Sequence, residues 1–130
     1  MTHPALRALD GETYLNLESF KKDGTGVKTP VWFAVVGAAV YIFTDGTSFK
    51  VKRVRNQGRA RFAACNVDGK RIKSAWFDSK AQVLEKDCPD EVAGYAALRK
   101  KYGLQMKLLD LGSKIGGRYG RRAMIRLDPT

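Results

Sequence analysis

The chain has 130 residues, enough for one domain and too few for two independent cores. Apolar residues make up 44% and charged residues 28% of the sequence, a balance that excludes a disordered chain and predicts a buried core. The 24 basic and 13 acidic side chains leave a net charge of +11. A surplus of this size favours a phosphate-bearing partner, which could be nucleic acid, an anionic membrane surface or a phosphorylated coenzyme.

Several classes of site and location are disfavoured by what the sequence lacks. Cys65 and Cys88 are far apart and form no CxxC pair, so neither a disulfide framework nor a zinc cluster is indicated. The single histidine, His3, is predicted to lie in a frayed terminus, which argues against a catalytic triad or a histidine-rich metal site. We therefore predict no catalytic side chain and no metal ligand of the protein's own. The apolar runs are too short for a membrane helix, and the N-terminus lacks a signal-peptide core, so we expect a cytoplasmic protein that does not associate with membranes.

The first half of the chain predicts a meander of three antiparallel strands. Tyr14 to Phe20 alternates apolar and polar residues, with Leu15 and Leu17 on one face. The Asp-Gly pair at position 24 predicts a tight hairpin turn. The second strand is expected from Val27 to Val36, and its Pro30 indicates an edge, a bulge or a close approach by something other than a strand. Its residues expected to point inward are Val27, Val31, Phe33 and Val35; after a turn at Gly37 to Ala39, the third strand is Val40 to Thr44.

The second half predicts further strands, with helices placed between them. A short helix is expected from Phe49 to Asn56, with Val51 and Val54 on its buried face. A longer helix begins at the capping Asp87, runs to about Tyr102 and ends at Gly103. The remaining predicted elements are strands at Ala60 to Val67, Arg71 to Phe77, Ala81 to Glu85 and Ala123 to Leu127, and a second helical piece at Leu104 to Leu111. Short strands at hairpin spacing favour a small antiparallel barrel that forms one domain over residues 1–130.

Two basic segments are candidates for binding an anion. Ser48 to Arg61 holds six basic residues and no acid, and its helix start offers Ser48 and first-turn amides to a phosphate. The alternative is a solvated helix face. Lys114 to Arg126 holds five basic residues interleaved with glycines. This second segment lacks the spacing of a phosphate-binding P-loop, so it is either a surface connector or a source of charge for a shared site.

The segment from Lys28 to Phe33 combines a charge, a hydroxyl, a proline and an indole. A flat aromatic ligand could receive backbone hydrogen bonds where Pro30 interrupts the ladder, and apolar contact from Val31 or Trp32. The alternative is that Trp32 is an ordinary core or interface aromatic.

The order of these motifs resembles the pyridoxamine 5'-phosphate oxidase-like family, in particular its small flavin- or deazaflavin-dependent oxidoreductases. The resemblance spans nearly the whole chain. Its strongest parts are Thr-Pro-Val-Trp at 29–32 and Ser-x-Lys-x-Lys-Arg-x-Arg-Asn at 48–56, although Asn56-Gln57-Gly58 stands where many relatives have Asn-Pro. The resemblance implies a mainly β fold, an antiparallel split β-barrel of six or seven strands that forms a homodimer with two cofactor sites between its subunits.

The resemblance also implies which residues hold the cofactor. Lys50 falls at the phosphate-binding lysine of the family, and Ser48 and Lys52 lie close to it. The segment from Lys28 to Val31 matches the strand that runs along the ring system. The complete set of implied contact residues is Lys28, Thr29, Pro30, Val31, Phe43, Thr44, Ser48, Lys50, Lys52, Lys73 and Ser74.

The activity that the resemblance implies is hydride transfer between the cofactor and a small organic substrate. The deazaflavin coenzyme F420, with its long anionic tail, uses more of the +11 charge than flavin mononucleotide (FMN) does, so we favour F420 and keep FMN as the alternative. Two other readings stay open: a flavin- or haem-binding barrel without turnover, and a basic nucleic-acid-binding barrel. The latter would use as stacking platforms Phe33, Tyr41, Phe43, Phe62 and Trp76.

Overall fold

The structure is a computed structural model that describes residues 3–106, 108 and 122–130. Its helices are α1 (Pro4–Leu9), α2 (Phe49–Gln57) and α3 (Pro89–Tyr102). Its strands are β1 (Tyr14–Phe20), β2 (Gly26–Val31), β3 (Ala34–Val36), β4 (Ala39–Asp45), β5 (Arg59–Cys65), β6 (Phe77–Val83) and β7 (Arg122–Pro129). No helix among these described residues has the length and apolar content needed to cross a bilayer.

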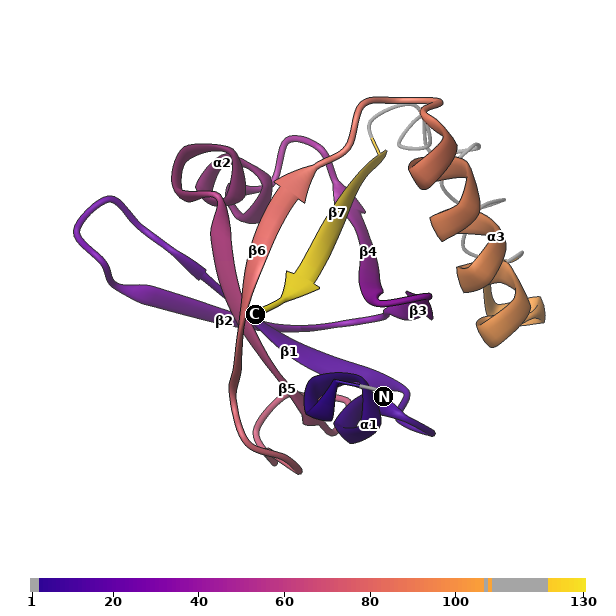
Figure 1. Cartoon of the computed structure of the whole chain (residues 1–130), viewed down its shortest axis with the longest axis horizontal. Helices are drawn as coiled ribbons and strands as arrows, with labels where there is room; N and C mark the ends of the chain where they lie inside the picture. Colours follow the sequence, from indigo (N-terminus) through magenta and orange to yellow (C-terminus); the bar gives the residue numbers. More distant parts are fainter. Residues whose placement is uncertain (1–2, 107, 109–121) are drawn as a thin grey trace.

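The strands form a single curled sheet in the order β2-β1-β5-β6-β7-β4-β3, in which every neighbouring pair is antiparallel. The β1–β2 hairpin projects from one side of the molecule, and α3 lies on the other side beside β3 and β4 (Figure 1). The predicted fold class, a mainly β antiparallel barrel, is confirmed. Because β2 and β3 stand at opposite ends of the strand order, the barrel is not closed by a hydrogen-bonded ladder.

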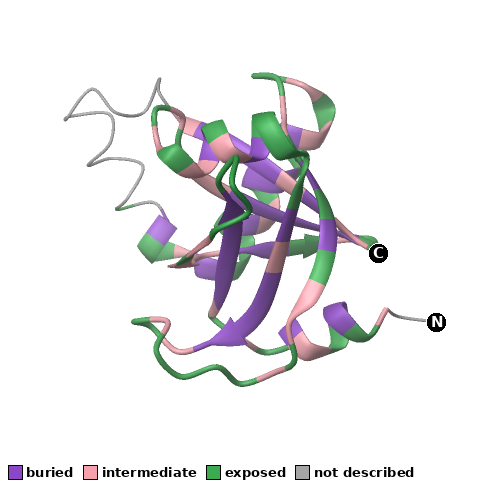
Figure 2. Cartoon of the chain, turned by 90° about the vertical axis from the view of Figure 1, so that its left-hand side faces the viewer, coloured by how far each residue is buried: buried purple, intermediate pink, exposed green. Residues whose placement is uncertain are grey.

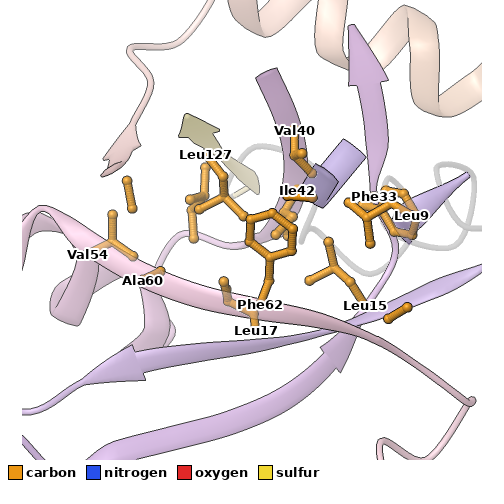
Figure 3. Packing of buried hydrophobic residues seen from close by; sticks show 14 of the residues in the cluster. Leu9, Leu15, Leu17, Phe33, Val40, Ile42, Val54, Ala60, Phe62 and Leu127 are labelled. Atoms are coloured by element: carbon orange, nitrogen blue, oxygen red, sulfur yellow. The ribbon is translucent and has the colours of Figure 1, made fainter. Parts of the chain in front are cut away.

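The inner face of the curled sheet holds the main core (Figure 3). Leu15 and Leu17 of β1 are fully buried there, as their alternation predicts, and they pair in register with Ala64 and Phe62 of β5. The predicted helix α2 closes one end of this core, because Val51 and Val54 on its inner face are 0% and 1% exposed. Buried stretches follow the strands, whereas the helices alternate between buried and exposed residues (Figure 2).

A second, smaller core lies on the outer face of β4 and β7, beneath α3. Tyr95 and Leu98 of α3 pack there with Tyr41 of β4 and Met124 of β7. Gly94 lets the helix come this close, since a Cβ atom at that position would lie 3.0 Å from both Tyr41 and Met124. The outer face of this half of the sheet is therefore covered by protein.

The predicted strand from Val27 to Val36 is two strands, β2 and β3, separated by Trp32 and Phe33. Pro30 lies on β2, an edge strand that pairs only with β1 among the described strands, so the edge reading of this proline is confirmed. Val31 and Phe33 contact the main core as predicted. Val35 does not, because the chain has moved to the other edge of the sheet and leaves its side chain 40% exposed.

The predicted strand from Arg71 to Phe77 is wrong. Only one isolated bridge, between Cys65 and Ile72, forms there, and β6 begins at Phe77. The Ser74 hydroxyl accepts the Ala64 N–H at 2.9 Å, so a side chain takes the donor that a strand ladder would have used. The predicted strand at Ala81 to Glu85 is correspondingly the second half of β6.

Helix ends also differ from the prediction. The N-cap of α3 is Cys88, whose Sγ accepts the Glu91 N–H, and not Asp87, which adopts a φ of 63°. Gly103 ends the helix as expected. The predicted helical piece at Leu104 to Leu111 is described only for 104–106 and 108, which are helical, and the basic stretch from 112 to 121 lies outside the described residues.

Helix α1 has no counterpart in the prediction, and His3 is not frayed. The His3 Nδ1 accepts the Ala5 N–H at 3.0 Å and caps this helix. Its Nε2 lies 3.2 Å from the Thr130 carbonyl oxygen, to which it donates in the tautomer that the first bond requires. The histidine therefore joins the two ends of the described chain.

Replacing Tyr102 by Phe tests how α3 is fastened to the sheet. The Tyr102 hydroxyl accepts the Phe33 N–H at 3.0 Å and lies within donor distance of the Thr13 and Phe33 carbonyl oxygens, at 2.7 and 3.1 Å. We expect Tyr102→Phe to lower the free energy of unfolding by about 1–3 kcal/mol in urea titrations, because it leaves the buried Phe33 N–H without a partner. Tyr14→Phe is the control, and an equal loss in both variants would contradict this role.

Candidate functional site

The sheet has two edges without a ladder partner in the described chain, and we call the region between them the split. It is bounded by β2 on one side and by β4 from Ile42 to Asp45 on the other, because β3 pairs only with the first part of β4. Two residues, Trp32 and Phe33, carry the chain from β2 to β3, so the edges meet there. The rings of Trp32 and Phe43 touch across this junction, with centroids 6.3 Å apart.

Two of the sequence-predicted contact segments lie on these facing edges. Continuing the β3–β4 register by three residues, from the pair Ala34 and Tyr41, would place Val31 opposite Thr44. The segments Lys28 to Val31 and Phe43 to Thr44, 12 or more residues apart in sequence, are thus brought to one opening. Sequence order alone could not show this, because β2 and β4 are not hydrogen-bonded partners.

The four residues of β2 point to opposite faces of the sheet. Thr29 and Val31 are opposite Leu17 and Leu15, so they share the inner face with the main core. Lys28 and Pro30 share the outer face with Glu18 and Asn16. The Thr29 Oγ1 atom is buried and has no hydrogen-bond partner within the described chain. It is a polar atom that a ligand in the split could satisfy.

Helix α2 packs against β1, β6 and β7. It begins four residues after the end of β4, and its Arg53 donates a hydrogen bond from Nη1 to the Ser19 Oγ at 3.2 Å. Ser19 pairs with Val27 in the β1–β2 register, so Arg53 reaches the hairpin end of β1. The helix therefore lies near the hairpin end of the split, away from the junction at Trp32 and Phe33.

Two polar side chains at the start of α2, Ser48 and Lys50, lack a hydrogen-bond or ion-pair partner in the described chain. Ser48 is the N-cap residue, yet its hydroxyl makes no capping bond, and its Oγ is buried without a partner in the described chain. Lys50 is half-buried and has no ion pair among the described residues. Burial lowers the pKa of its ammonium below the usual 10.5, the charge of Arg53 lowers it further, and Asp45 acts in the opposite direction. No acidic side chain lies in the first turn, so an anion would be stabilised here.

Lys52 points away from Lys50, because an α-helix turns by about 100° per residue and these two lysines are two positions apart. Its Nζ lies 5.3 Å from the ring centroid of Phe49, which is 70% exposed. The Arg53 guanidinium lies 5.8 Å from the same centroid. Lys52 thus belongs to the solvent-facing side of α2 and could meet only an extended part of a ligand.

Lys73 and Ser74 are not brought into the split. Lys73 Nζ forms an ion pair with Glu12 at 3.3 Å. The Ser74 hydroxyl accepts the Ala64 N–H and donates to the Ala75 carbonyl oxygen at 2.9 Å. Both side chains are engaged by partners within the described chain and fasten the segment that precedes β6, so their predicted contact with a cofactor stays a prediction.

A group of side chains on the outer face next to β2 has no counterpart in the sequence prediction. The Lys28 Nζ lies 5.0 Å and the Arg61 guanidinium 5.5 Å from the ring centroid of Trp76. Arg61 also pairs with Glu18 at 3.2 Å and lies 3.6 Å from Asp78. The opposite signs of Lys28, Glu18 and Arg61 on successive strands were the available signal, once their register was known.

Most of the aromatic rings that were predicted to stack on nucleic-acid bases are buried in the two cores. Phe62, Phe33 and Tyr41 are 0%, 1% and 3% exposed. Phe43 packs against the second core, and Trp76 lies against Lys28 and Arg61. A ring buried in a core cannot stack on a base, so this reading loses the residues on which it depended.

The lowered pKa of Lys50 predicts a rise of stability at alkaline pH. A lysine whose folded pKa lies below its unfolded value loses its proton first in the folded state, so the free energy of unfolding rises with pH from the folded value up to about 10.5. We expect Lys50→Met to reduce this rise and to stabilise the protein at pH 7 by up to about 0.5 kcal/mol, since the half-exposed charge is screened. Chemical denaturation from pH 7 to 11 measures this, with Lys52→Met as the control. A Lys50→Met variant less stable than the parent at pH 7 would contradict it.

Comparison with known proteins shows similarity at the level of structure. No protein-family model and no curated protein sequence matches the chain. The haem storage protein HutZ from Vibrio cholerae matches with a TM-score of 0.75 and 13% identity, over 100% of this chain and 92% of HutZ. An F420 reductase matches with a TM-score of 0.61 and 15% identity, over 100% of this chain and 96% of the reductase.

A FAD-binding protein from Mesorhizobium loti matches with a TM-score of 0.64 and 18% identity, over 97% of this chain and 87% of that protein. Identities this low establish the fold and leave ligand and activity open, because one fold hosts many functions. The curled antiparallel sheet, its open split and these matches together show that the chain has the split-barrel fold of the pyridoxamine 5'-phosphate oxidase-like proteins.

Proposed function

We propose that the chain is an oxidoreductase that binds the deazaflavin coenzyme F420, with FMN as the alternative, in the split between β2 and β4. Two observations at the start of α2 carry this proposal. Lys50 is a half-buried cation without an ion pair in the described chain, and the Oγ of the N-cap residue Ser48 is buried without a partner there. Together with the first-turn amides of α2, they form a receptor for one phosphate group.

The residues of the split suit a flat ring attached to that phosphate. Thr29 offers its unsatisfied Oγ1, Val31 offers an apolar surface, and Thr44 lies on the opposite edge. The free backbone groups along β2 can hydrogen-bond to the ring edge, and Pro30 leaves one position without a donor. When bound, the coenzyme supplies a carbon that accepts or donates hydride; the chain orients the ring against a small organic substrate and keeps water away.

The preference for F420 rests on charge. Beyond Lys50, the exposed side of α2 continues with Lys52 and Arg55, and the whole chain carries +11. A long anionic tail running along this helix would use these side chains, whereas the single phosphate of FMN would end at Lys50.

Haem binding is the second candidate that the fold suggests, because HutZ is a haem storage protein. The only histidine of this sequence, His3, has both ring nitrogens engaged, by the Ala5 N–H and the Thr130 carbonyl. A histidine axial ligand would require breaking at least one of these contacts. The geometry therefore favours the phosphate-bearing coenzyme.

Changing Lys50 to Ala tests the phosphate receptor. We expect affinity for F420 to fall about ten- to a hundredfold, because a charge-assisted contact is lost, while thermal stability stays within about 0.5 kcal/mol. Fluorescence titration with F420 and with FMN measures both affinities and decides between them. Lys22→Ala, an exposed lysine next to the β1–β2 turn, is the matched control. Equal affinity of the parent and the Lys50→Ala variant for both coenzymes would remove the basis of the proposal.

We also propose that two copies of the chain form a homodimer whose interface covers the split. One chain provides the edges β2 and β4 with α2 nearby, and leaves Phe49 at the start of α2 70% exposed. Sedimentation velocity of the chain loaded with coenzyme is expected to give twice the monomer mass. A monomer at that point would mean that each subunit binds coenzyme alone.

A further inference from the structure

A cavity apart from the split is lined by residues of α1, the β3–β4 turn and the end of α3. Its volume is about 440 Å³, within the range of small-molecule sites. Its apolar wall consists of Leu6, Leu9, Phe33 and Val35, of which the first three are at most 8% exposed. Its polar lining consists of Arg7, Asp10 and Lys101, with Gly11 and Gly37 at the rim.

Lys101 is held on the apolar wall. Its Nζ lies 3.3 Å from the ring centroid of Phe33 and 5.3 Å from that of Tyr102. No ion pair of Lys101 occurs within the described chain. Glu12 is the acid whose charge acts on it, and Glu12 is already paired with Lys73 at 3.3 Å. Burial lowers the pKa of Lys101 to about 8. Lys101 as a whole is exposed, and its ammonium lies on the apolar wall without an ion pair in the described chain and within reach of an anionic ligand.

The charge of the lining indicates how much negative charge the ligand carries. Two cations, Arg7 and Lys101, and one carboxylate, Asp10, leave one net positive charge. A monoanion balances it, whereas a dianion would leave an excess charge beside Asp10. The buried leucine and phenylalanine side chains suit a hydrocarbon chain, since each methylene moved from water onto such a surface contributes about 0.8 kcal/mol.

We propose that this cavity binds an aliphatic monocarboxylate, with its carboxylate between Lys101 and Arg7 and its chain along Leu6, Leu9 and Phe33. The cavity and the split share only the junction residue Phe33, and the cations of the cavity, Arg7 and Lys101, are not those assigned to the split. The two sites are therefore distinct.

The pH dependence of binding follows from the groups that face Lys101. These are Arg7 and Asp10 of the α1 side, Glu12 before β1, and Tyr102, whose pKa burial raises to about 12. Affinity for the carboxylate requires the protonated amine. It falls as the pH rises through the pKa of Lys101, up to tenfold per pH unit, and the bound anion raises that pKa.

Isothermal titration of the full chain with octanoate tests the proposal, with octanol as the uncharged probe of equal length. We expect octanoate to bind at least tenfold more tightly than octanol at pH 7, and this difference to vanish at pH 10. Lys101→Met should remove the preference, because it keeps an apolar side chain without the charge. Lys100→Met, the adjacent exposed lysine of α3, is the matched control and should bind as the parent does.

A second readout does not depend on any variant at position 101. Trp32 stacks on Tyr102 with ring centroids 4.3 Å apart, so its fluorescence should change as octanoate fills the cavity in a Trp76→Phe background. Equal binding of octanoate and octanol, or equal losses in the Lys100 and Lys101 variants, would overturn the proposal. Loss of octanoate binding in Lys50→Ala would place the ligand in the split and overturn it as well.

Discussion

The link between the two edges of the sheet, Trp32 and Phe33, determines the shape of this barrel. Tyr102 of α3 holds the backbone of Phe33 through its hydroxyl, and its ring stacks on Trp32 with an interplanar angle of 7°. The ring of Phe33 is buried in the main core. With this junction held, β2 and β4 meet at one end and have no ladder between them elsewhere, which produces the split.

The two candidate sites share one electrostatic feature. Lys50 at the split is half-buried and Lys101 at the second cavity is exposed but lies against the Phe33 ring; neither has an ion pair in the described chain, and contact with the protein lowers the pKa of each. Each charge costs stability in the free protein and becomes favourable when an anion arrives. In an exposed ion pair, such as that of Lys73 with Glu12, the charge is already compensated, so an added anion would gain little stabilisation there. The position of uncompensated charge, rather than the total of +11, therefore marks the sites.

The two faces of the sheet have different roles. The inner face carries the aliphatic core and the orphaned Thr29 hydroxyl. The outer face is covered by α3 over β4 and β7, and by the Lys28, Trp76 and Arg61 group near β2. This division buries most of the rings that could have stacked on bases, and leaves β2 and the second part of β4 as sheet edges without a ladder partner in the described chain.

The sequence by itself determined the elements whose signals are local: the alternation of β1, the Asp-Gly hairpin turn, the buried face of α2 and the glycine that ends α3. Through the family resemblance it also predicted Lys28–Val31 and Phe43–Thr44 as cofactor-contact segments. Only the tertiary structure decided that these segments lie on the two free edges of the sheet, that Ser74 takes the Ala64 N–H beside 71–76, that His3 joins the two ends of the described chain, and that Lys101 lines a cavity. Alternation and turn residues act over a few positions, whereas hydrogen-bond partners and burial depend on residues far apart in the chain.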